Sequence, residues 1–236
     1  MRILPALIGV GVALAAITAK HQGAGEALLM IIGSSAAAMA GFLTLVGPML
    51  IRDDLRSDLL QMDLLKTYPL PGWTILLGEV MAPSAVLAAA QWFLLLIAAA
   101  LIPSLGRMHP SFSQRVLVGL SAALVLPCFS MIGVLIQNAV ALIWPGWVEL
   151  GKGNRQGIEA MGQRLITIVA TLLTLVVAVI PAAIIFGIIY FLGSFVIGTA
   201  VMPIAALASA LCLLAEAGFA IMWLGRIFDT FDVSRS

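Results

Sequence analysis

The longest charged stretch in this chain is residues 52–79, RDDLRSDLLQMDLLKTYPLPGWTILLGE. Its first half is dense in aspartate, arginine and lysine, while leucine and methionine recur between them at spacings of three and four residues. This pattern predicts a short amphipathic helix that lies in water. The helix is expected to end at Tyr68, because Pro69 disfavours the α conformation in the residue before it and Pro71 repeats the restriction.

The end of this stretch predicts a return to the membrane. Gly72 is expected to allow a tight turn, and Trp73 suits the boundary between membrane and water. A polar helix, a stiff turn and an immediate return would form a compact projection on one side of a membrane.

The composition places the chain in a membrane. Of its 236 residues, 62% are hydrophobic and 10% are charged, whereas soluble domains carry about 25% charged residues. The net charge is +1, and no basic run with interleaved aromatic residues is present, so the sequence indicates no nucleic-acid partner.

About 20 mainly apolar residues are needed to cross a bilayer as a helix. Six stretches meet this requirement, which predicts an all-α, polytopic membrane helix bundle in which residues 1–236 form a single transmembrane domain. They are Ile3–Ala19, Ala27–Ile51, Ile75–Pro103, Val116–Trp144, Leu165–Leu192 and Phe195–Gly225. The first stretch is short, and a secretory signal peptide is the alternative interpretation of it.

Lysine and arginine counts predict the orientation, because these residues are enriched in cytoplasmic loops. With both termini in the cytoplasm, the cytoplasmic side carries most of them. These are Arg2, Arg52, Arg56, Lys66, Lys152, Arg155, Arg164, Arg226 and Arg235, against Lys20, Arg107 and Arg115 outside. The two long cytoplasmic loops are then residues 52–74 and residues 145–164. The second is rich in glycine and is expected to lead into a short helix over residues 158–164.

No catalytic motif is present. The sequence has no phosphate-binding loop, no HExxH and no GxSxG. His21 and His109 have no ligand partner nearby in sequence, and Cys128 and Cys212 lie far apart in apolar stretches. The chain is therefore not expected to be an enzyme or to bind a metal or cofactor by itself.

One polar set lies inside the predicted membrane helices. Glu216 stands well inside the last stretch, and Gln137 with Asn138 are its expected partners in the fourth. Ionisable residues in membrane segments are costly and are functional candidates. Two roles remain open: a substrate path or proton relay, and hydrogen bonding between helices. The same two roles, substrate path and interhelical hydrogen bonding, are open with less reason for Gln91, Ser130 and Thr171.

Three segments resemble transmembrane subunits of type-two ABC exporters, in particular a bacterial group of ABC exporter permeases. They are DLRSDLLQMDLLKTYPLPGWTILLGE at residues 54–79, GKGNRQGIEAMGQRL at residues 151–165 and FDTFDVS at residues 228–234. In that group an amphipathic helix precedes a Leu-Lys-x-x-Pro-Leu turn and a Gly-Glu or Gly-Lys that re-enters the membrane. Members of the group are about twice as long, so the chain is expected to be a carboxy-terminal part or a shortened version.

The resemblance implies that residues 52–74 act as a coupling helix, which docks on a separate ATPase subunit that binds ATP and magnesium. A second permease copy or a homologous half is the other implied partner, in the cytoplasmic membrane of a bacterium. Carried over by position, the coupling residues are Asp58, Leu64, Leu65, Lys66, Pro69, Leu70 and Pro71, with Gly78 and Glu79 at the membrane return.

Two other functions stay open at the level of sequence. One is a secondary transporter driven by protons through Glu216, Gln137 and Asn138. The other is a membrane scaffold that transports nothing, in which residues 52–74 are a solvated linker.

Overall fold

The computed structural model describes residues 24–51, 69–101, 112–143 and 158–230. Within these ranges the chain is helical, with no strand. The elements are α2 (Ala24–Leu50), α5 (Gly72–Leu101), α6 (Phe112–Ile143), α7 (Ile158–Ile197), the 3-10 turn η4 (Gly198–Val201) and α8 (Met202–Thr230). Helices are expected here, because a helix satisfies all of its own backbone hydrogen bonds in a solvent that offers none.

Four helical stretches are long and apolar enough to cross a membrane, which indicates a multi-pass membrane protein. They are Leu28–Leu50, Gly72–Leu101, Phe112–Ile143 and Ile168–Thr230, and the last of these folds back at η4. The first predicted span, Ile3–Ala19, lies outside the described residues. The count of six spans and the cytoplasmic position of both termini stay predictions.

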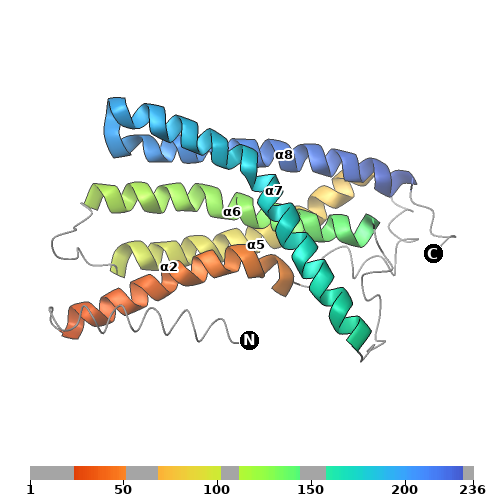
Figure 1. Cartoon of the computed structure of the whole chain (residues 1–236), viewed down its shortest axis with the longest axis horizontal. Coiled ribbons are helices and arrows are strands. Elements are labelled where there is room, and N and C mark those ends of the chain that lie inside the picture. Colours follow the sequence, from red (N-terminus) through yellow and green to blue (C-terminus); the bar gives the residue numbers. More distant parts are fainter. Residues whose placement is uncertain (1–23, 52–68, 102–111, 144–157, 231–236) are drawn as a thin grey trace.

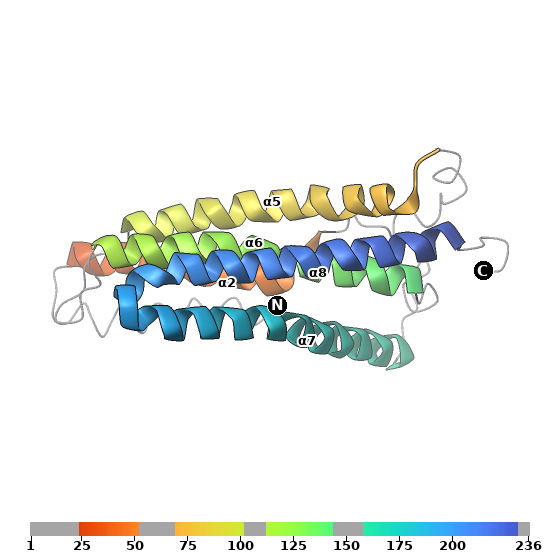
Figure 2. The same cartoon turned by 90° about the horizontal axis from the view of Figure 1, so that it is seen from above.

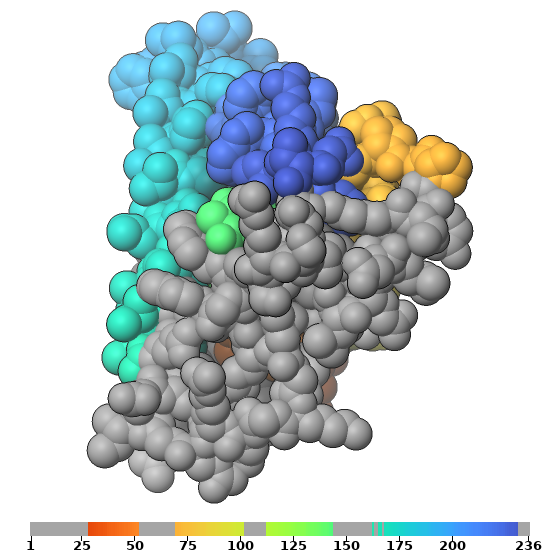
Figure 3. Space-filling model, turned by 90° about the vertical axis from the view of Figure 1, so that its right-hand side faces the viewer, coloured from red at the N-terminus to blue at the C-terminus, as the bar shows by residue number. Residues whose placement is uncertain are grey.

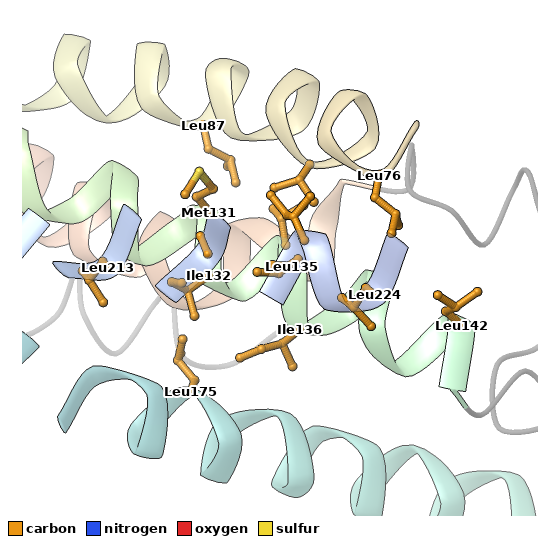
Figure 4. Close-up of a cluster of buried hydrophobic side chains, with 14 of the residues drawn as sticks. Leu76, Leu87, Met131, Ile132, Leu135, Ile136, Leu142, Leu175, Leu213 and Leu224 are labelled. Atoms are coloured by element: carbon orange, nitrogen blue, oxygen red, sulfur yellow. The ribbon is translucent and has the colours of Figure 1, made fainter. Parts of the chain in front are cut away.

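Helix α6 is the centre of the bundle. It packs against each of the other four described helices, and α2, α5 and α8 run roughly along it (Figures 1 and 2). Every residue from Ser130 to Asn138 is buried, so neighbours surround this part of α6 on all sides. Figure 4 shows Leu87 of α5 meeting Met131, and Leu175 of α7 pointing toward Ile132 and Ile136. The outer faces of the bundle carry exposed leucine, isoleucine, valine and phenylalanine, as lipid contact requires.

The break predicted between Leu192 and Phe195 is wrong. Helix α7 continues to Ile197, and the reversal is made by η4. Gly198 has a φ of 63°, a left-handed conformation that glycine adopts without steric cost. A Cβ atom on Gly193 would collide with Val201, so the missing side chain lets the chain fold back closely. Hydropathy could not locate this turn, since the residues on both sides of it are apolar.

Helix α7 is much longer than a membrane is thick. Its 40 residues span about 60 Å, against about 30 Å for the hydrocarbon core. The short helix predicted over residues 158–164 is the beginning of α7 and not a separate element. Figure 1 shows α7 bending midway and then crossing away from the others, and Pro181 is the proline within it. Proline inside a helix removes a backbone hydrogen bond and bends the axis.

Gly133→Ala should weaken the fold. A Cβ atom at Gly133 would lie 2.8 Å from Cγ of Pro48 in α2, and overpacking of this kind costs about 1–3 kcal/mol. The matched control is Gly119→Ala in the same helix, where a Cβ atom meets nothing within 4 Å. Titration with a denaturing detergent, followed by circular dichroism, measures both variants. Equal midpoints would contradict the close contact between α2 and α6.

Candidate functional site

The described part of the predicted coupling stretch is its exit into the membrane. Pro69, Leu70 and Pro71 are exposed, and the Leu70 side chain is 55% accessible. Asp58, Leu64, Leu65 and Lys66, which the resemblance assigns to ATPase docking, lie outside the described residues. The exit therefore presents a leucine between two prolines to the surroundings.

Helix α5 begins directly after Pro71, at Gly72. The carbonyl oxygen of Pro71 accepts hydrogen bonds from the Thr74 amide at 2.9 Å and the Thr74 hydroxyl at 2.7 Å. Residues 72–74, the last three of the predicted loop, form the first turn of α5. The two hydrogen bonds fix the direction in which the chain enters the helix.

The first amide of α5 is held by α8. Gly72 donates its N–H to Oδ1 of Asp229 at 2.9 Å, although the two residues are 157 positions apart. The first amides of a helix have no partner within it, and the positive end of the helix dipole favours a carboxylate. Asp229 therefore supplies from a distant segment the cap that α5 needs.

Two glycines allow the backbones of α5 and α8 to touch. A Cβ atom on Gly225 would lie 2.6 Å from the Trp73 amide nitrogen and 2.7 Å from its Cα. A Cβ atom on Gly72 would lie 2.7 Å from both the Gly225 carbonyl oxygen and Asp229 Oδ1. We call Gly72, Trp73, Gly225, Phe228 and Asp229 the α5–α8 joint. Figure 3 shows the end of α8 lying beside the start of α5.

The joint gives Gly72 a role in addition to the predicted one. Gly72 lies in the tight turn that the hydrogen bond from the Thr74 amide to the Pro71 carbonyl closes. Among the described residues Gly198 alone has a positive φ, so this turn does not require a glycine. The absent side chain of Gly72 is needed for close approach to α8. Phe228 is almost fully buried beneath the contact, which leaves no room for the helices to shift without repacking.

Gly78 and Glu79 follow in the second turn of α5. A Cβ atom on Gly78 would meet nothing within 4 Å, so this glycine marks no close contact inside the monomer. Glu79 is partly buried and takes part in an interaction.

The predicted intramembrane set lies on two helices that pack together, α6 and α8. Gln137 and Asn138 are buried, and Asn138 donates from Nδ2 to the Val134 carbonyl at 3.2 Å. Glu216 is partly exposed, and the hydrogen bond it accepts comes from Cys212 Sγ of its own helix at 3.6 Å. The hydrogen bond of Glu216 therefore stays within α8 and does not join it to the side chains of Gln137 and Asn138.

A different polar cluster joins three helices. Gln91 of α5 donates from Nε2 to Ser130 Oγ of α6 at 2.6 Å and to Thr44 Oγ1 of α2 at 3.1 Å. All three side chains are buried, and Gln91 Oε1 has no hydrogen-bond partner among the described residues. Thr44 was not singled out from the sequence, where a lone hydroxyl in an apolar stretch gives little signal. The cluster fixes α2, α5 and α6 against each other.

Within the described ranges, no three His, Cys, Asp or Glu side chains are grouped so that they could hold a metal ion.

Comparison of the chain with protein-family models, with curated proteins and with solved structures found no match. The resemblance to exporter permeases therefore rests on the residues of its three segments.

Gly225→Ala should disrupt the joint. The new methyl group would meet backbone atoms of Trp73, which cannot rotate away, so a loss of about 1–3 kcal/mol in unfolding free energy is expected. Gly218→Ala is the control, because a Cβ atom there meets nothing within 4 Å and the residue lies in the same helix. Detergent-denaturation midpoints of the two variants provide the measurement. A Gly225→Ala protein as stable as the control would mean that the two backbones do not touch.

Proposed function

We propose that this chain is the permease subunit of an ATP-driven exporter in a bacterial cytoplasmic membrane. Residues 52–71 would dock on a separate ATPase subunit, which binds ATP and magnesium. The chain itself would contribute alternating access and no chemistry. A second copy or a homologous half would complete the permease.

The observation that carries this proposal is the α5–α8 joint. The coupling stretch ends at a helix whose first turn contacts the backbone of α8 and donates a hydrogen bond to Asp229. No flexible side chain separates Gly225 from Trp73. A displacement of the stretch by a partner would therefore move α5 and α8 together.

Two of the resembling segments meet at this joint. Gly72 belongs to the segment at residues 54–79, and Asp229 to the segment at residues 228–234. Segments distant in sequence that resemble one family and form one contact support a shared mechanical role. The third segment, residues 151–165, includes the start of α7.

Helix α8 connects the joint to α7, so a movement at the joint would be transmitted to α7. Helix α8 is tied to α7 through η4 and through Ser209, whose hydroxyl donates to the Ala182 carbonyl at 2.9 Å. Beyond Pro181, toward its amino terminus, α7 diverges from α8 (Figure 1). Movement of α8 would change its separation from the amino-terminal half of α7. We infer that access to the bundle alternates between these two helices.

The shape of the exit suits docking on a protein. Leu70 is exposed, and Pro69 and Pro71 on either side have fixed φ angles. Because the two prolines restrict the backbone, the segment loses less backbone entropy when Leu70 enters a groove, and buried apolar anchors dominate interface energies.

Leu70→Asp should abolish co-purification of the proposed ATPase partner. A carboxylate in the docking groove would be buried without a partner, which is strongly unfavourable. Because Leu70 is exposed in the chain alone, the variant should still fold and enter the membrane. Val196→Asp is the control, since Val196 is exposed at the opposite end of the bundle.

Retention of the ATPase by Val196→Asp and its loss from Leu70→Asp would support the proposal. Equal recovery with both variants would place the contact elsewhere. No recovery with the wild-type chain would favour the proton-driven transporter or the scaffold instead.

A further inference from the structure

One side of α8 carries Glu216. The residues of this side follow each other at spacings of three and four. Near the turn Ala205 and Ser209 are buried, and farther along Cys212, Ala220 and Ile227 are partly exposed and pack against the hydrophobic core. Glu216 is also partly exposed, and Trp223 is 51% exposed, so these two residues form the exposed edge of this side.

Helix α7 covers the part of this side that lies near the turn. Ser209 contacts Ala182 of α7, and Ala182 is buried. Figures 1 and 2 show that α7 then runs away from α8, and its residues Leu172, Leu173 and Val176 are exposed. Glu216 and Trp223 therefore belong to the part of α8 beyond its contact with α7.

Glu216 lies at the middle of α8, farther from the two helix ends than the other residues on this side. It is the central residue of the 29-residue helix α8, so each helix end is about 20 Å away along the axis. That distance exceeds the reach of a glutamate side chain to water. A carboxylate at such a depth is costly unless a charge or donor compensates it, and the weak thiol donor Cys212 supplies little of this.

The described segments of a second copy of the chain offer no cation at this depth. In the ranges that the structure describes, basic residues occur near the beginning of α6, near the beginning of α7 and near the end of α8. They are Arg115, Arg164 and Arg226. None lies at the middle of a helix, so a homodimer contact could not place an ammonium or guanidinium group on Glu216 from these segments.

We propose that Glu216 and the adjacent exposed surface of α8 bind an apolar organic cation that enters from the bilayer beside α7. The carboxylate compensates the positive charge, and the flanking apolar surface holds the organic groups. Phe219 and Trp223 are exposed on the same flank, and aromatic faces attract cations in a desolvated site. That the cation is transported rests on the proposed exporter function, for which it would be the substrate. That the cation binds at Glu216 does not depend on that function.

Tetraphenylphosphonium is the probe, with the full chain in nanodiscs of zwitterionic phosphatidylcholine and empty nanodiscs as background. Equilibrium dialysis at neutral pH should show saturable binding to the wild-type chain. Glu216→Gln removes the charge and keeps the side-chain shape, so affinity should fall at least about tenfold. Glu26→Gln, at the beginning of α2, removes the same charge elsewhere and should leave binding unchanged.

A measurement on the unaltered chain covers the case in which Glu216→Gln fails to fold. Dicyclohexylcarbodiimide, an apolar reagent, adds to protonated carboxyl groups in membranes, and the modified peptide is located by mass spectrometry. Tetraphenylphosphonium should protect Glu216 from this reagent.

Equal binding by wild-type and Glu216→Gln proteins, binding by neither, or labelling of Glu216 that the cation does not slow would each overturn the site. If the site fails while Leu70→Asp still releases the ATPase, the exporter proposal stands with a different cargo. If the site holds while the wild-type chain recovers no ATPase, the cation site belongs to another kind of transporter.

Discussion

The contact between Gly225 and the backbone of Trp73 fixes α5 against α8 at one end of the bundle. Two helix backbones touch there without intervening side chains, and the Asp229 carboxylate caps the helix that begins at the contact. Close backbone approach through small residues is a main source of helix association in membranes, where the hydrophobic effect no longer drives helices together. The joint is thus both a packing contact and a fixed orientation between α5 and α8.

The remainder of the bundle divides into a fixed part and a diverging part. Helices α2, α5, α6 and α8 pack along one another, with the hydrogen bonds of Gln91 joining three of them. Helix α7 is attached at η4, at Ser209 and through Leu175, and otherwise turns exposed apolar residues outward. A rigid group of helices beside one that diverges is a suitable arrangement for alternating access, because motion can concentrate at one boundary.

Hydropathy was sufficient to predict the helices but not their ends. The second, third and fourth predicted spans agree with α2, α5 and α6 to within a few residues, because a bilayer demands long apolar helices. The turn at Gly198 was missed, since apolar residues flank it on both sides. Gly72 was interpreted as a turn residue alone, because its contact with α8 depends on a segment 157 positions away that local sequence does not reveal. Glu216 was expected beside Gln137 and Asn138, whereas the hydrogen bond that it accepts comes from Cys212 of its own helix.

The most direct test of this account is the distance between spin labels at Leu77 of α5 and Met222 of α8, both exposed. Double electron-electron resonance would be recorded on the complex with the proposed ATPase, with and without a non-hydrolysable ATP analogue. The pair Met222 and Ile166 of α7 would be measured in the same way. The account predicts an unchanged, narrow distance between labels 77 and 222, and a changed distance between labels 222 and 166. A shift or broadening between labels 77 and 222, or no change in either pair, would contradict transmission through the joint.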